Sequence, residues 1–290
     1  MDAPSGVDFS GENDALVAAT FLALGSAVLH AAWNLLVKTS SDRLIAAWGL
    51  YVTGGILFLP VFLVIDLPGA DTLPFLAASS VVHVVYVVAL TRAYQHGDFS
   101  FAYPLARGGG ALFAAIGGVL FLADTLSGLA WLAIAIVVGG LASLVRPGVS
   151  RVALLWAGLT AATIGTYTTL DAAGARRSSG LGYGIAIVLG AGLVLSAAIV
   201  ASGRAGRLGP AIEREWPRFL VGGVCSTLAY SMVLAGARLA PVGYVAALRE
   251  SSVILGAGAG WLFLHERLGR ARLASALVVT AGLVLLIVWQ

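Results

Sequence analysis

Three charged side chains, Arg107, Arg249 and Glu250, stand inside runs that are otherwise apolar. A guanidinium keeps its charge in proteins, so an arginine cannot become neutral by losing a proton. An arginine at the centre of a membrane helix is unfavourable by roughly 2.5–3.5 kcal/mol on insertion scales, and such residues usually face a bundle interior or a wet cavity. Two roles are open. Either the arginines bind an anionic group of a substrate, or Glu250 neutralises one of them in an internal ion pair.

Aromatic and hydrogen-bonding side chains recur at helical spacing in similar apolar runs. Trp33 and Asn34 lie three and four residues after His30, and this spacing places them on the same face of a helix as His30. Small-molecule sites are usually lined by apolar and aromatic walls with a few polar groups. We therefore predict these substrate-binding residues: His30, Trp33, Asn34, His83, Tyr86, Tyr103, Arg107, Tyr167, Tyr230, Arg249 and Glu250.

The elements that must position these residues are membrane helices. Of the 290 residues, 59% are hydrophobic and 11% are charged, whereas soluble proteins average about 25% charged residues. A membrane helix needs about 20 apolar residues, and the runs do not alternate as the strands of a membrane barrel would. We predict an all-α integral membrane protein with ten transmembrane helices. The expected spans are 15–37, 44–65, 73–94, 101–122, 128–145, 152–171, 181–201, 218–238, 243–264 and 272–289.

The chain also contains an internal repeat. A shift of 142 positions places Arg107 on Arg249 and "LFLADTL" on "LFLHERL", without a gap from 93 to 287. Each half is expected to contain five helices. Because five is an odd number, the second half enters the membrane from the side opposite to the first, as in many secondary transporters. We expect an exposed tail (1–14), a first five-helix repeat (15–146) and a second (147–290), which together form one transport domain.

Charges between the spans predict the orientation. Twelve Lys and Arg residues lie at one membrane side, and only Arg176, Arg177 and Arg238 lie at the side of the termini. Because basic residues accumulate in cytoplasmic loops, both termini are expected outside the cytoplasm, and the long "GRAGRLGPAIEREWPR" loop inside it. Tryptophan and tyrosine also gather at membrane interfaces, and we assign Trp48, Trp131, Trp216 and Trp289 to such belts.

Proline and glycine predict local helix geometry. Pro104 lies three residues before Arg107 and removes a backbone donor, so a kink or break is expected there. The glycines at 108–110, 117–118, 256, 258 and 260 predict close helix packing.

Several classes of chemistry lack their motifs. The chain has no Walker-type phosphate loop, no H-E-x-x-H, no G-x-S-x-G and only one cysteine, Cys225. We expect no enzymatic activity, no metal, no cofactor and no nucleic-acid partner. The expected partners are a small-molecule substrate and membrane lipid, and the chain is expected to work as a monomer.

Ten spans, the five-plus-five repeat, a "W-N-x-x-x-K" end to the first span and "LFLHERL" before the last helix resemble the drug/metabolite transporter superfamily. The resemblance is specifically to its EamA-domain family and to YddG-like amino-acid exporters. It covers nearly the whole chain and implies export of amino acids and related metabolites across a bacterial inner membrane. In the first repeat Asp124 stands where the family motif has a glutamate. The acid that small multidrug transporters carry in the first helix has no counterpart here.

The leading hypothesis is therefore a multi-pass inner-membrane exporter of amino acids that works by alternating access. Arg107 or Arg249 would attract a carboxylate, and Glu250 an ammonium group. Efflux of apolar compounds is an alternative, for which aromatic walls suffice, and a non-transporting membrane enzyme or scaffold is another. Coupling to protons and downhill export both remain open.

Overall fold

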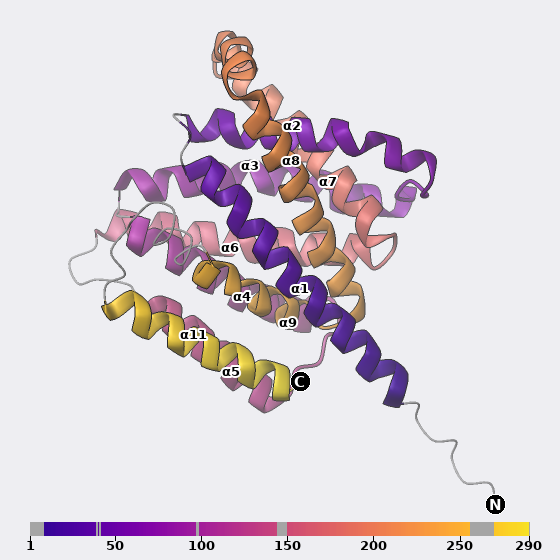
Figure 1. Ribbon diagram of the computed structural model, residues 1–290, viewed down its shortest axis with the longest axis vertical. Helices are drawn as coiled ribbons and strands as arrows, with labels where there is room; N and C mark the ends of the chain where they lie inside the picture. The colour runs from indigo at the N-terminus through magenta and orange to yellow at the C-terminus, as the bar shows by residue number, and fades with distance from the viewer. Residues whose placement is uncertain are drawn as a thin grey trace, which may run out of the picture.

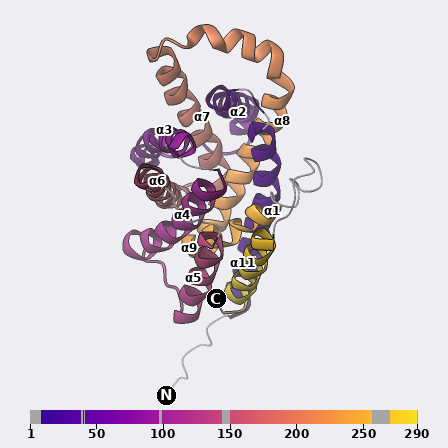
Figure 2. The ribbon, with the colours of Figure 1, turned by 90° about the vertical axis from the view of Figure 1, so that its left-hand side faces the viewer.

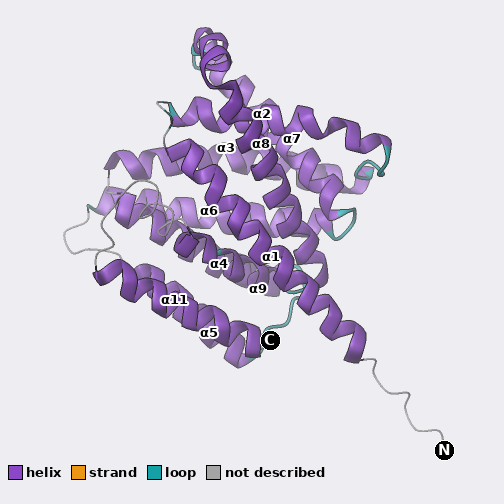
Figure 3. Ribbon diagram, in the orientation of Figure 1, coloured by secondary structure: helices purple, strands orange, loops and turns teal. Residues whose placement is uncertain are grey.

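The computed structural model describes residues 9–38, 40, 42–96, 99–143, 150–255 and 270–289, without the side chains of residues 9–12, 38, 43, 94, 99–104 and 270–273. Regular structure in these ranges is helical throughout (Figure 3). Five helical stretches are long and apolar enough to cross a membrane, and three shorter ones are apolar as well. The prediction of an all-α chain with several apolar helices is confirmed, and this composition is that of an integral membrane protein.

Each expected span overlaps a helix of the described chain. The helices are α1 (Phe9–Lys38), α2 (Arg43–Phe58), α3 (Leu73–His96), α4 (Phe99–Phe121), α5 (Gly128–Ala142), α6 (Arg151–Ala175), α7 (Gly180–Ala201), α8 (Leu208–Leu239), α9 (Val242–Arg249) and α11 (Arg270–Trp289). Short 3₁₀ turns are η1 (Leu59–Leu63), η2 (Ala70–Thr72) and η3 (Ala205–Arg207). Local sequence sets several of the starts, because the side chains of Asp42, Ser127, Ser150 and Ser179 accept hydrogen bonds from the first-turn amides of α2, α5, α6 and α7.

The helices form one bundle with two ends along its long axis. In Figure 1, α5 and α11 lie side by side at one end, and α2 lies near the other with α7 and the start of α8. Between these ends α6 packs on both α3 and α4, and α1 packs on α8. Most of the buried polar side chains belong to helices of this middle part, α1, α3, α4, α6, α8 and α9.

Glycines bring α4 and α6 into close contact, as the sequence predicted for 108–110 and 117–118. A methyl group on Gly110 would lie 2.5 Å from Ile164 Cγ2, and one on Gly165 would lie 2.9 Å from the backbone carbonyl carbon of Phe113. Neither position therefore accepts a side chain without a shift of the helices. The predicted packing glycines at 256, 258 and 260 lie outside the described residues.

Two helix starts differ from the sequence prediction. Helix α1 begins at Phe9, inside the segment expected to be an exposed tail. Helix α8 begins at Leu208, so most of the expected loop before residue 218 is helical and continues through Pro217. Hydropathy identifies apolar runs only, and the first turns of α8 carry too many charged residues to be recognised in this way.

The interruption expected near Arg107 occurs instead in the second half of the chain. Helix α4 continues through Pro104, its sixth residue, where a proline removes a single helical hydrogen bond. The ninth expected span is divided: α9 ends at Arg249, a turn follows at Glu250, and a helical stretch begins at Ser251. The break predicted as one alternative at Pro104 is therefore absent, and the other alternative, a kink, stays a prediction.

Candidate functional site

The divided span carries two of the three charged residues that the sequence singled out. The Glu250 amide donates to the carbonyl of Ala247 at 3.0 Å, three residues back instead of the four of an α-helix. Arg249 and Glu250 are only 7% and 3% exposed. In transporters, interrupted helices often supply polar groups to a site within the bilayer. The break therefore marks these two side chains as the centre of the candidate site.

Arg107 and Glu250 form a two-pronged ion pair between α4 and the end of α9. Arg107 Nε donates to Glu250 Oε2 at 3.2 Å, and Nη2 lies 2.8 Å from Oε1. The two side chains are 7% and 4% exposed. Parallel bonds of a guanidinium with a carboxylate are among the strongest polar contacts in proteins. Each charge of this pair is thus neutralised by the other.

Arg249 has a different environment. Its Nη2 donates to His30 Nδ1 at 2.9 Å, and its Cζ lies 5.7 Å from the ring centre of Tyr230. Because an arginine only donates, His30 Nδ1 is the acceptor, and the proton of the neutral ring is on Nε2. Arg249 Nε is buried without a hydrogen-bond partner, and no carboxylate of the described residues forms an ion pair with Arg249. This guanidinium therefore has unused donor capacity inside the bundle.

Aromatic rings form a cluster beside Arg249. His83 stacks on Tyr167 with ring centres 4.1 Å apart, and Tyr86 meets Tyr167 edge-on at 5.6 Å. Tyr230 meets His83 at 5.9 Å and Tyr167 at 6.3 Å. The rings come from α3, α6 and α8, which pack together in the middle of the bundle. Tyr230 thus belongs both to this cluster and to the surroundings of Arg249.

Asp171 is a buried acid that the sequence reasoning missed. Its carboxylate is 0% exposed and accepts hydrogen bonds from the hydroxyls of Tyr183, at 3.3 Å, and of Tyr230. The expected sixth span ended at this residue, where an acid would be unremarkable, but α6 continues to Ala175. The two serines after Glu250, Ser251 and Ser252, were also missed. Their hydroxyls are buried and lack partners in the described chain.

Three other predicted residues have different surroundings. Trp33 is half-buried and meets the ring of His30 edge-on at 4.7 Å. Asn34 donates its side-chain amide to the carbonyl of His30 at 2.8 Å, one turn back on the same helix. The side chain of Tyr103 lies outside the described residues. Trp48, expected at a membrane interface, is instead buried and donates to Ser196 Oγ at 2.8 Å, so that assignment is wrong.

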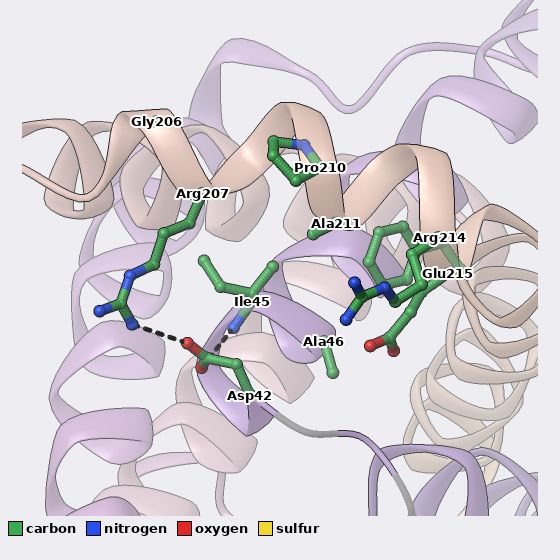
Figure 4. Close-up of a pocket in the computed structure, with 10 residues that line it drawn as sticks. Asp42, Ile45, Ala46, Gly206, Arg207, Pro210, Ala211, Arg214 and Glu215 are labelled. Atoms are coloured by element: carbon green, nitrogen blue, oxygen red, sulfur yellow. Dashed lines mark hydrogen bonds and ion pairs between the residues drawn. The ribbon is translucent and has the colours of Figure 1, made fainter.

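A pocket of about 280 Å³ lies away from these residues, between the start of α2 and the start of α8 (Figure 4). Its lining includes Asp42, Arg207, Arg214, Glu215 and Phe219 and none of the predicted substrate-binding residues. Asp42 caps α2 and lies 3.4 Å from Arg207. The pocket is therefore a separate feature at the helix ends.

Comparison with known proteins assigns the fold and the kind of domain. Residues 151–288 match the EamA-like transporter family. The chain therefore carries an EamA-like transporter domain. This domain, which contains Asp171, Tyr230, Arg249 and Glu250, places the protein in the drug/metabolite transporter superfamily, whose EamA members are transporters rather than enzymes. With the apolar helices, the domain identifies a multi-pass membrane protein.

One solved crystal structure has a similar fold, with a TM-score of 0.73 and 14% sequence identity. The match covers 94% of this chain and 96% of the other, so the likeness extends well beyond the EamA-like domain. At this identity it concerns the fold alone. No curated protein matches the chain.

Proposed function

We propose that this EamA-like protein is a bacterial inner-membrane secondary transporter that exports amino acids, aromatic and apolar ones included, and related small metabolites. The observation that carries the proposal is Arg249, a buried guanidinium whose Nε has no hydrogen-bond partner and which forms no ion pair among the described residues, where it contacts His30 and Tyr230. A buried donor without a partner costs about 1–3 kcal/mol, and more when it is charged. A substrate carboxylate would supply both the missing acceptor and the missing charge.

The ion pair supports different roles for the two arginines. Arg107 already holds a carboxylate, that of Glu250, so in this conformation its guanidinium is occupied. We therefore assign the substrate carboxylate to Arg249 and a structural role to Arg107. Glu250, predicted as an ammonium ligand, can take that role only in a conformation in which Arg107 releases it.

The aromatic cluster supports a substrate with an apolar or aromatic side chain. Tyr86, Tyr167, Tyr230 and His83 present ring faces and edges close to the arginine. Aromatic pairs with offset or edge-on geometry contribute about 0.5–1.5 kcal/mol beyond the burial of their area. A phenylalanine or leucine side chain would therefore find favourable contacts in the cluster, while its carboxylate reaches Arg249.

The packing of the helices supports alternating access by two inverted repeats, 15–146 and 147–290. Taken in order, the first five helices correspond to the last five, so that α1 matches α6 and α3 matches α8. Under this correspondence the α1–α8 contact has the α6–α3 contact as its equivalent, and both contacts are present. Helices α2 and α7, α4 and α9, and α5 and α11 pack directly on their own counterparts. Alternating access between such repeats needs only one chain. The loop charges support an orientation with both termini outside the cytoplasm.

Transport into proteoliposomes tests this proposal. Purified protein is assayed with radiolabelled L-phenylalanine and L-leucine, with phenethylamine as the analogue that lacks the carboxylate, and with a cationic dye. We expect saturable flux of the two amino acids, which falls sharply in Arg249→Ala at substrate concentrations below saturation of the parent, while the folded protein is retained. Flux of the dye and of phenethylamine alone would favour efflux of apolar compounds. Amino-acid flux that Arg249→Ala leaves unchanged would refute the carboxylate assignment.

A further inference from the structure

The first turns of α8 differ from the rest of that helix in direction and exposure. Figure 2 shows this start running across the end of α2 before the helix turns and enters the bundle. Most residues from Leu208 to Arg218 are exposed, whereas Phe219 is buried and meets the ring of Trp48 edge-on. Pro217 lies at this change and removes one helical hydrogen bond. Residues 205–218, which comprise η3 and these first turns of α8, form a helical arm at one end of the bundle.

The arm carries an apolar stripe that continues into the spanning part of α8. Ile212, Trp216 and Leu220 are spaced by four residues and are 47%, 58% and 38% exposed. Side chains four residues apart share one helix face. Val221, the next residue, is also 53% exposed on the outer surface. In a membrane protein, the exposed Leu220 and Val221 in the spanning part of α8 face lipid. Trp216 lies one turn earlier on the same helix face, where the lipid surface ends.

Basic residues surround the stripe. Arg204, Arg207, Arg214 and Arg218 are all exposed. Arg207 lies 3.4 Å from Asp42, and Arg218 lies 3.9 Å from Glu215. Arg214 lines the pocket of Figure 4 and forms no ion pair with an acid of the described residues. The pocket thus combines an apolar floor, to which Ile45 and Phe219 contribute, with an available guanidinium at its rim.

We propose that the arm, residues 205–218, lies in the membrane–water interface, and that the pocket between α2 and α8 binds the phosphate of an anionic phospholipid headgroup. Amphipathic helices with an aromatic apolar face and a basic polar face bind at this depth, and anionic lipids strengthen the binding. Arg214 supplies donors of the kind that a phosphate prefers, and Arg207, at the other side of the pocket and next to Asp42, carries a second guanidinium (Figure 4). The acyl chains then run along the exposed Ile212, Trp216 and Leu220.

Lipid titration followed by native mass spectrometry tests the headgroup site. Each arginine near an anionic surface changes affinity by about fivefold. We therefore expect Arg214→Gln to weaken phosphatidylglycerol binding about fivefold and Arg207→Gln/Arg214→Gln about 25-fold. The control is Arg92→Gln/Arg151→Gln, which removes two exposed charges that do not line the pocket. It should leave the affinity unchanged. Equal loss in the control, or equal affinity for phosphatidylcholine, overturns the site.

A second measurement distinguishes lipid from a free anion and does not depend on transport. The fluorescence of Trp216 is the part of the protein's fluorescence that is lost in Trp216→Phe. Brominated phosphatidylglycerol and brominated phosphatidylcholine are compared as quenchers of this fluorescence. Stronger quenching by the brominated phosphatidylglycerol, reduced in Arg214→Gln, supports the proposal. Absence of quenching shows that the arm does not lie in the lipid. If inorganic phosphate competes fully with phosphatidylglycerol, the pocket is a site for soluble anions and the lipid assignment is wrong.

Discussion

Arg107 and Arg249 occupy matching positions in the two halves of the chain but have opposite surroundings. Helix α4 continues past Arg107 to Gly108, whereas α9 ends at Arg249 and the acid Glu250 follows. Adjacent helical residues do not face one another, so Glu250 points away from its sequence neighbour and pairs with Arg107. Arg107 is thereby neutralised, whereas Arg249 Nε has no hydrogen-bond partner in the described part of the chain. Two arginines that the 142-residue shift of the sequence aligns thus have chemically different surroundings.

The largest effect that would separate the two arginines is on folding. Arg107→Ala leaves Glu250 as a buried charge without its partner, and this should lower the free energy of unfolding by about 3–5 kcal/mol. Chemical unfolding of purified protein in detergent measures the loss. The double change Arg107→Met/Glu250→Leu should recover most of it, because it removes both charges. If the single variant is as stable as the parent, the ion pair is not structural and the contrast with Arg249 disappears.

The next largest effect is on transport, and it is expected when Arg249 is replaced. Arg249→Ala should raise the half-saturating concentration of a carboxylate substrate about 30-fold or more, because loss of one partner of a buried charge pair costs about 2 kcal/mol or more. Its stability should change less than that of Arg107→Ala, since no acid of the described chain loses a partner. Uptake assays at graded substrate concentrations, with phenethylamine as the carboxylate-free comparison, give the value. Equal changes for both compounds would contradict the assignment.

Asp171 sharpens the comparison, because Tyr230 contacts both this acid and Arg249. Asp171→Asn should lower the free energy of unfolding by about 1.5–3 kcal/mol, the size of a hydrogen bond to a charged group, and should also impair uptake. Tyr183→Phe is the matched control, since Tyr183 also donates to Asp171. It should reduce stability without affecting the half-saturating concentration. Equal effects on uptake in both variants would show that Asp171 does not act through Tyr230.

The smallest expected effect is at His30. His30→Leu removes the acceptor of Arg249 Nη2 and should weaken substrate binding about fivefold, corresponding to one hydrogen bond of about 1 kcal/mol. His30→Asn keeps an acceptor on a short side chain and should have a smaller effect. The same uptake titration measures both. A loss as large as that of Arg249→Ala would mean that His30 itself contacts the substrate.

The helix positions could be predicted because apolar length is a local property. The expected spans agree with the helices to within a few residues at most ends. The start of α8 was missed because its first turns are charged and because their amphipathic pattern extends over too few residues to be recognised in the sequence. Asp171 was missed for a different reason. Its burial depends on Tyr183 and Tyr230, which come from other helices.

The sequence by itself determined that the chain is an all-helical membrane protein, and it identified Arg107, Arg249 and Glu250 as the costly residues inside it. It did so because apolar runs and their exceptions are visible without a fold. Only the tertiary structure decided which arginine the glutamate neutralises. Glu250 and Arg249 are neighbours in sequence, but their side chains reach different helices: Glu250 pairs with Arg107 on α4, and Arg249 donates to His30 on α1. Those partners are brought within reach by the packing of α1 and α4 on α9, which local sequence does not specify.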